Sequence, residues 1–178
     1  TLLRFNEPPH TELTKKMTVF AGDYQPKSGD LAGFIVCAKS PSCGMERVRL
    51  YDENGNRGRK ESVGLFTAAL LETWPWLPVE EDGRLHDPVL RENFIERVFA
   101  LHELNTLRAN GLTRRALLDF HSRYKLQLLA HHQAGYREIG PFVASLHEWE
   151  DLEAFFVAYR EKLMTILKKP ASRKNHTN

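Results

Sequence analysis

The sequence predicts an α/β domain, built on a partial parallel sheet with helices, followed by an all-α helical domain. Residues 1–87 alternate short apolar segments with helical patterns and many turn residues, whereas residues 88–169 show almost continuous helical periodicity with short breaks. The change in pattern places a domain boundary near Asp87. The predicted domains are therefore residues 1–87 and residues 88–178.

The first predicted elements are a short strand over residues 2–5 and a helix that begins at about Thr11. Threonine often caps helix N-termini, and Leu13, Met17 and Phe20 follow Thr11 as an apolar stripe at helical spacing. We therefore expect Thr11 to be the N-cap of this helix.

Two further strands and a second helix complete the predicted first domain. Residues 33–37 are continuously apolar, which predicts a strand covered on both faces. Residues 47–51 predict another strand, which ends at a turn over residues 52–55. Residues 63–74 predict a helix that Pro75 stops, because proline cannot continue it.

In the second domain, capping residues indicate where helices begin and end. Asp87-Pro88 predicts an N-cap followed by proline at the first helical position. Residues 110–111, Asn-Gly, end this helix, and Thr113 begins the next one. Residues 140–141, Gly-Pro, predict a break between two shorter helices, and a strongly amphipathic helix follows over residues 152–166.

Composition describes a globular protein without a secretory or membrane signature. The 178 residues are 42% hydrophobic and carry a formal net charge of +2, with the basic excess in the second domain. No apolar run is long enough to span a bilayer, and residues 1–9 lack the basic and then apolar layout of a signal peptide. We therefore expect a cytoplasmic protein that has no membrane partner.

Two cysteines, Cys37 and Cys43, limit the cysteine chemistry of the chain. Two thiols make neither a disulfide framework nor a four-ligand zinc site. Cys43 lies in the loop Lys39-Ser40-Pro41-Ser42-Cys43-Gly44, directly after the apolar strand. In open α/β sheets, sites form beyond the carboxyl ends of strands, and small residues let backbone amides converge on one point.

The chemistry of this loop centres on the thiol of Cys43. Lys39 and the nearby backbone amides favour a thiolate, which is the form that acts as a nucleophile or a metal ligand. The alternative is a tight turn in which Cys43 only packs against its neighbours.

Residues 1–100 contain a series of separated short motifs. They are Gly33-Phe34-Ile35-Val36-Cys37-Ala38-Lys39-Ser40-Pro41-Ser42-Cys43-Gly44, Glu46-Arg47-Val48, Tyr51-Asp52, Gly64-Leu65-Phe66, Leu77-Pro78-Val79-Glu80-Glu81, Gly83-Arg84-Leu85 and Arg91-Glu92-Asn93-Phe94-Ile95. In this order the motifs resemble the thiouracil desulfidase family.

The resemblance implies a four-iron four-sulfur (4Fe-4S) cluster held by three cysteines, with one iron free to take sulfur from a thiocarbonyl substrate. Cys43 matches one cluster ligand and Ser40 matches the active-site serine of the family, while Ser42 is a second candidate for contact with substrate or cluster. The implied reaction is non-redox, and the implied partner is a small thiolated molecule such as thiouracil.

The chain departs from the family in its cysteines. The other two cluster cysteines of the family belong to N-terminal motifs that this sequence does not contain, and Cys37 is no substitute because we expect it within a buried strand. The simplest interpretation is that a segment upstream of Thr1 is missing. We therefore predict that this chain alone binds no intact cluster and is inactive as a fragment.

Residues 95–178 contain a second series of short motifs. They are Phe99-Ala100-Leu101-His102-Glu103-Leu104, Gly111-Leu112-Thr113-Arg114, His121-Ser122-Arg123-Tyr124-Lys125-Leu126, Leu129-Ala130-His131, Tyr136-Arg137 and His176-Thr177-Asn178. These motifs resemble the YbgA family of bacterial proteins, and the resemblance supplies no reaction. Because the family continues into further helices, we expect the C-terminus to be truncated too.

Polar residues of the helical part form a candidate site for a substrate or an anion. His121 and Lys125 lie one helical turn apart, and His131 or His132 falls about three turns further along the chain. Arg123 lies nearly opposite His121, so the residues do not all share one face. The alternative is a partly buried histidine with solvated basic neighbours, and no metal-binding spacing is present.

Two functions of different classes remain open. The first is an iron-sulfur desulfidase whose site the helical module closes or extends. The second is a binding module, in which the helical part recognises nucleic acid or a protein partner and the α/β part is a structural support. The basic excess permits nucleic-acid binding, although the dense Lys/Arg blocks of a dedicated binding arm are absent.

Three consecutive acidic residues lie near the end of the first predicted domain. They are residues 80–82, Glu-Glu-Asp. We expect them to form a solvated acidic loop rather than a catalytic pair.

Overall fold

The computed structural model describes residues 3–4, 11–24, 31–51, 57–172 and 175. The chain divides into two compact units. The first comprises residues 1–75 and 79–86, and the second comprises residues 76–78 and 87–178. A small parallel sheet with helices therefore precedes a mostly helical region, which confirms the predicted fold class.

Among its described residues, the first unit has three two-stranded sheets and two α-helices. One strand pair is parallel, with Phe34 opposite Val79 and Val36 opposite Glu81, while the other two pairs are antiparallel. The elements in chain order are β1 (Leu3–Arg4), β2 (Thr11–Glu12), α1 (Thr14–Tyr24), β3 (Phe34–Val36), β4 (Val48–Tyr51), β5 (Arg57–Ser62), α2 (Leu65–Thr73), β6 (Val79–Glu81) and the 3-10 helix η2 (Arg84–His86).

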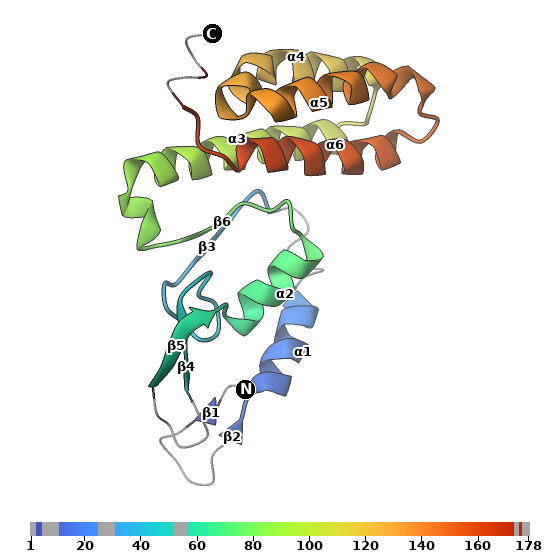
Figure 1. The fold of residues 1–178 in the computed structure, drawn as a ribbon. Helices are drawn as coiled ribbons and strands as arrows, with labels where there is room; N and C mark the ends of the chain where they lie inside the picture. The colour runs from blue at the N-terminus through green and yellow to red at the C-terminus, as the bar shows by residue number, and fades with distance from the viewer. Residues whose placement is uncertain (1–2, 5–10, 25–30, 52–56, 173–174, 176–178) are drawn as a thin grey trace. The chain divides into compact units, whose positions relative to one another are not determined.

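An aromatic cluster joins the helices of the first unit to β3. Helices α1 and α2 pack side by side (Figure 1). The ring of Phe66 on α2 lies 5.3 Å from that of Tyr24, 5.6 Å from that of Phe34 and 6.1 Å from that of Phe20. Tilted and edge-on contacts at these distances suit aromatic quadrupoles, so Phe66 is the centre of this small core.

Two predictions for the first unit were wrong. Thr11 does not cap a helix but pairs with Arg4 in a strand, and α1 begins at Thr14. The strand over residues 33–37 is not covered on both faces, because Ile35 is 55% exposed and Cys37 is also exposed. A continuous apolar sequence indicates hydrophobicity, but it does not show whether one face of the strand or both faces are buried.

Other predictions for the first unit hold. Residues 3–4 form a strand, as expected for the segment 2–5, and the strand predicted over 47–51 is present as β4. The helix predicted over 63–74 is present as α2. The turn expected over residues 52–55 lies outside the described residues.

The part of the second unit that the structure describes contains four long helices. They are α3 (Pro88–Ala109), α4 (Arg114–His131), α5 (Gln133–Ala144) and α6 (Leu152–Leu167), with the 3-10 helix η3 (Ser145–Glu148) before α6. The predicted N-caps are confirmed: Asp87 accepts hydrogen bonds from the backbone of Val89 and Leu90, and the Thr113 hydroxyl accepts one from Ala116. At the end of α3, Gly111 adopts a positive φ of 98°, which glycine tolerates.

Helix α6 provides much of the core of the helical unit. It packs against α3, α4 and α5 (Figure 1), and its residues Phe156, Tyr159 and Leu163 are almost completely buried. Burial of each such side chain contributes about 1.5–3 kcal/mol to folding. Among the described residues, no helix has both the length and the apolar character that a membrane crossing requires.

The predicted break at residues 140–141 was wrong. Helix α5 runs without interruption through Pro141. Proline has no N–H, so the carbonyl of Arg137 lacks its usual partner four residues later. The buried side chains of Ile139 and Val143 flank the proline and anchor α5 in the core, which explains why the helix continues.

Trp76 explains why a short segment before β6 belongs to the helical unit. The guanidinium of Arg160, on α6, lies 3.7 Å from the centre of the Trp76 ring. Trp76 is only 9% exposed. Stacking of a guanidinium on an indole is a favourable cation–π contact, so Trp76 is fixed to α6.

Candidate functional site

The cysteine loop, residues 37–46, follows β3 and folds on itself around Ser40. The amide of Gly44 donates to the carbonyl of Ser40 at 2.8 Å. The hydroxyl oxygen of Ser40 accepts hydrogen bonds from the amides of Ser42 and Cys43, both at 3.3 Å. Ser40 therefore shapes the turn that presents Cys43.

The first turn of α2 holds the same loop from one side. The amide of Gly64 donates to Gly44 at 2.7 Å, and the amide of Phe66 donates to Ser42 at 2.8 Å. The hydroxyl of Thr67 donates to the carbonyl of Cys43 at 2.7 Å. The first amides of a helix have no partner inside the helix, and here the carbonyls of the loop satisfy them.

Two glycines make this contact possible. A Cβ atom at Gly64 would lie 2.5 Å from the amide nitrogen of Cys43 and 2.6 Å from the carbonyl carbon of Ser42. A Cβ atom at Gly44 would lie 2.8 Å from the carbonyl oxygen of Ser40 and 2.7 Å from a methyl group of Val48. The loop and the start of α2 therefore meet at a distance that only glycine permits.

The carboxylates at the end of β6 hold the loop from the other side. One oxygen of Glu81 accepts hydrogen bonds from the amides of Met45 and Glu46, at 2.9 and 3.2 Å. Asp82 accepts from the amide of Ala38 at 2.9 Å and from that of Gly83 at 2.7 Å. These two backbone hydrogen bonds hold the pKa of Asp82 below its usual value.

Arg84 links two carboxylates across the same region. Its Nε lies 2.6 Å from Glu80 and its terminal nitrogen lies 2.8 Å from Glu46. Burial opposes the charged guanidinium, but the hydrogen bonds and charges of Glu80 and Glu46 together raise the pKa of Arg84. The charge of Glu80 is thus compensated within the unit.

The prediction of a solvated acidic loop at residues 80–82 was wrong. Glu80 and Glu81 lie in β6 and are only 7% and 5% exposed, and only Asp82 is exposed. Buried carboxylates need partners: Glu80 accepts from Arg84, four residues later, and Glu81 accepts from the distant amides of Met45 and Glu46. The acidic run holds the cysteine loop.

The thiol of Cys43 occupies a defined position at the centre of these contacts. Its amide and its carbonyl are both hydrogen-bonded, and its side chain is half-buried. Cys43 lies between two non-glycine residues with positive φ, Lys39 within the loop at 63° and Arg47 directly after it at 54°. Such strained conformations persist where surrounding contacts enforce them, as they do here. Ser42 is half-buried beside the thiol.

A 4Fe-4S cluster does not fit the cysteines of this chain. Such a cluster takes Cys thiolates as its ligands, and the implied arrangement needs three. The chain has Cys37 and Cys43 only, and Cys37 is exposed after β3. Within the described residues, no group of three or more His, Cys, Asp or Glu side chains is placed to bind a metal ion.

The structure separates the four polar residues proposed for the helical part. His121 and Lys125 line one cavity between α4 and α5. Arg123 instead forms an ion pair with Glu103 of α3. The His131 side chain is fully buried, with Nε2 3.0 Å from Glu96.

Sequence reasoning missed three polar residues of the cavity between α4 and α5. Ser122 of α4 and both Tyr136 and Arg137 of α5 line it together with His121 and Lys125. The spacing of Tyr136, Gly140 and Val143 along one helical face was the available signal, but the predicted break at Pro141 concealed it.

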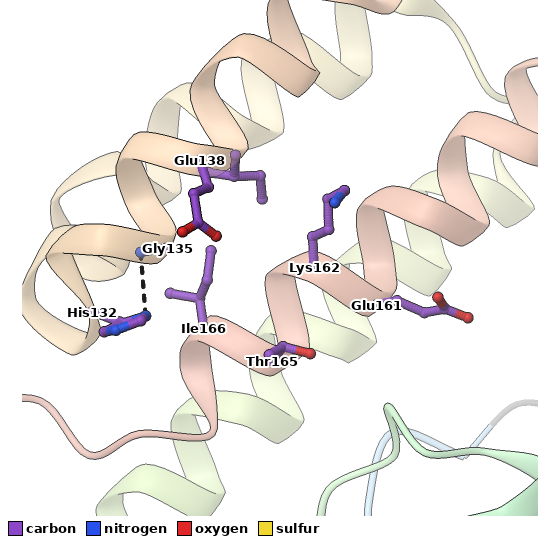
Figure 2. Close-up of a pocket in the computed structure, with 8 residues that line it drawn as sticks. His132, Gly135, Glu138, Glu161, Lys162, Thr165 and Ile166 are labelled. Carbon is purple, nitrogen blue, oxygen red and sulfur yellow. Dashed lines mark hydrogen bonds between the residues drawn. The ribbon is translucent and has the colours of Figure 1, made fainter.

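A second cavity lies between α5 and α6 and has a volume of about 380 Å³. Figure 2 shows its lining, including His132, Glu138 and Lys162. Nδ1 of His132 accepts from the amide of Gly135 at 3.2 Å, and its Nε2 lies 2.7 Å from the ammonium of Lys169. Both nitrogens of His132 are therefore already used in the structure.

Comparison with known proteins finds family matches for two separate segments of the chain. Residues 3–82 match the family model of 2-thiouracil desulfurase, and residues 125–178 match that of DUF1722, a protein of unknown function. A segment of 82 residues is 54% identical to the uncharacterized protein YbgA of Escherichia coli strain K12 and covers 46% of this chain and 48% of YbgA. The match thus spans about half the length of that relative, and no solved structure matches the chain. The N-terminal side of the chain is therefore similar to the 2-thiouracil desulfurase family, and its C-terminal side is similar to the DUF1722 family.

Proposed function

We propose that the first unit belongs to a desulfurase that removes sulfur from a small thiolated compound such as 2-thiouracil. In the net reaction, the oxygen of water replaces the thiocarbonyl sulfur and hydrogen sulfide leaves, so no electrons are gained or lost. The observation that carries the proposal is the fixed Cys43 thiol, which lies inside the segment that matches the desulfurase family.

The residues of the loop have distinct roles in this proposal. Cys43 would supply one thiolate ligand to a 4Fe-4S cluster, and Ser40 and Ser42 would contact the substrate. Ser40 has a second role, because its oxygen already accepts the amides of Ser42 and Cys43. A hydroxyl whose oxygen accepts two N–H groups still has its proton to donate to a substrate.

The cofactor and the setting are part of the same proposal. A 4Fe-4S cluster needs two thiolates beyond Cys43, so we expect one only in a protein that supplies them. Two free cysteines suit a reducing cytoplasm, and the related YbgA is bacterial. Nucleic-acid or protein binding by the helical unit stays a prediction.

Sulfide release from 2-thiouracil tests the proposal. The complete gene product is reconstituted with iron and sulfide under anaerobic conditions, and sulfide and visible absorption are measured. Cys43→Ser is compared with Cys37→Ser, a matched control that removes the other thiol of the chain. We expect Cys43→Ser to abolish release and Cys37→Ser to retain it.

Two results contradict the proposal. Absence of sulfide release by the reconstituted complete protein means that the first unit is no thiouracil desulfurase. Equal release by the native protein and Cys43→Ser means that the loop thiol has no part in the reaction.

A further inference from the structure

The cavity between α4 and α5 is lined by basic side chains and by no acidic one. Its volume is about 410 Å³, within the range of small-molecule sites. Its polar lining residues are His121, Ser122, Lys125, Tyr136 and Arg137, and its apolar ones include Leu118 and Val143.

Two positive charges of this cavity are not neutralised. Lys125 and Arg137 form no ion pair with any described residue, and both side chains are exposed. Two arginines of α4 that do not line the cavity have acidic partners: Arg123 pairs with Glu103, and Arg115 lies 3.7 Å from Asp119. The cavity thus combines two cations with a lining that contains no carboxylate.

His121 adds a neutral donor to this pair of cations. It is 4% exposed, and its Nδ1 lies 3.0 Å from the hydroxyl of Tyr159. A tautomer in which Tyr159 donates to Nδ1 leaves an N–H at Nε2 for a ligand. Burial of the ring and the nearby charge of Lys125 lower the pKa of His121 and favour the neutral form, in which one ring nitrogen donates and the other accepts.

The combination of donors and charge identifies the class of ligand. We propose that this cavity of the helical unit binds the phosphate group of a small phosphate ester. A phosphate monoester carries a charge of about −1.5 to −2 at neutral pH, which matches Lys125 and Arg137, and its oxygens accept several hydrogen bonds. The hydroxyls of Ser122 and Tyr136 supply further donors, and Leu118 and Val143 supply an apolar wall for the organic part.

The second cavity shows that this combination is not general on the helical unit. The cavity in Figure 2 is of similar volume but includes Glu138 and Glu161 beside Lys162. Two carboxylates repel a phosphate, so we assign no anion to that cavity. The proposed phosphate site belongs to the helical unit and the cysteine loop to the first unit, and the phosphate proposal does not depend on the desulfurase proposal.

Calorimetric titration of the chain with inorganic phosphate and with phenyl phosphate, at constant ionic strength, tests the site. We expect Arg137→Gln and Lys125→Gln each to weaken binding about tenfold or more, because each removes a charge-assisted hydrogen bond. Arg115→Gln is the matched control: it removes one positive charge from α4 at a side chain that is 92% exposed and does not line the cavity. It should leave the affinity unchanged.

The choice of probe separates the possible sources of the phosphate. Tighter binding of phenyl phosphate than of inorganic phosphate supports an ester whose organic part contacts Leu118 and Val143. Equal binding of the two supports a site for the phosphate group alone. Benzoate, which has one negative charge and the same ring, should bind clearly more weakly than phenyl phosphate.

Several outcomes overturn the proposal. Benzoate binding as tightly as phenyl phosphate means that the site does not select phosphate. An equal loss of affinity in Arg115→Gln and Arg137→Gln means that the chain attracts anions through its overall charge. A single-stranded RNA that binds far more tightly and depends equally on Arg115 means that this face is a nucleic-acid surface. Absence of any phosphate binding, with all variants folded by circular dichroism, also refutes the site.

Discussion

A carboxylate oxygen of Glu81 lies 2.9 Å from the backbone nitrogen of Met45, although the two residues are 36 positions apart in the chain. The same oxygen accepts the amide of Glu46. Because Glu81 is in β6, this contact connects the parallel strand pair to the loop that carries Cys43. The conformation of the loop therefore depends on residues outside it.

Glu81→Ala should lower the free energy of unfolding of the first unit by about 2 kcal/mol, because it leaves two amides without an acceptor. Glu81→Gln should cost much less, since its side-chain oxygen accepts the same hydrogen bonds. Urea denaturation and hydrogen exchange at Met45 and Glu46 measure the effect. Equal stability of the alanine and glutamine variants would show that the carboxylate does not hold the loop.

Gly64→Ala should destabilise the first unit by about 1–3 kcal/mol through overpacking, and should displace the cysteine loop. The backbone of Gly64, with φ −63° and ψ 143°, suits alanine, so the cost comes from contact with the loop alone. Gly22→Ala is the control within the same unit. A Cβ atom there meets nothing within 4 Å, and alanine in a helix should stabilise by about 0.5–1 kcal/mol. Thermal denaturation that shows the same sign for both variants would contradict this prediction.

The stability of the helical unit should fall on acidification because of His121. Burial and the charge of Lys125 lower the pKa of His121 in the folded state. The unfolded state then binds the proton more readily, so stability is lost as the pH falls below the unfolded value of about 6.5. Lys125→Gln should raise the pKa of His121 and reduce this loss.

NMR titration of the His121 ring and urea midpoints at pH 7.5 and pH 5.5 measure these two effects. Arg115→Gln is again the control, since it removes a charge from α4 that does not line the cavity of His121. A pKa for His121 that rises equally in both variants would mean that Lys125 has no specific effect.

Trp76→Ala should destabilise the helical unit by about 3 kcal/mol or more, as expected for loss of a buried tryptophan. Arg160→Gln removes only the cation that stacks on the indole and should cost about 1–2 kcal/mol. Hydrogen exchange in α6 measures both. Unchanged protection of α6 in Trp76→Ala would show that residues 76–78 do not stabilise the helical unit.

Local signals in the sequence were sufficient to predict where α3 and α4 begin. Asp87 and Thr113 cap helices through contacts with the next few residues, so their chemistry is visible in a short window. Pro141 misled because its local effect on α5 is outweighed by the burial of Ile139 and Val143, which depends on the packing of α6. Tertiary contacts of this kind are not encoded in the neighbouring residues.

The candidate sites were predictable only in part for the same reason. The position of Cys43 after a strand indicated the loop, and the spacing of His121 and Lys125 placed both on one helical face. The function of Glu81 depends on amides 36 and 35 residues earlier, and Arg137 joins the cavity from another helix. Such long-range pairs cannot be inferred from periodicity.

The cysteine loop is held almost entirely through its backbone, by α2 on one side and by the carboxylates of β6 on the other. The side chain at position 43 makes none of these contacts, so its identity can change while the atoms that position it stay in place. Cys43→Asp or Cys43→His would therefore put an oxygen or a nitrogen donor where the sulfur now lies. The first unit therefore offers one position, residue 43, at which the metal-binding side chain can be changed without loss of the backbone contacts that hold the loop.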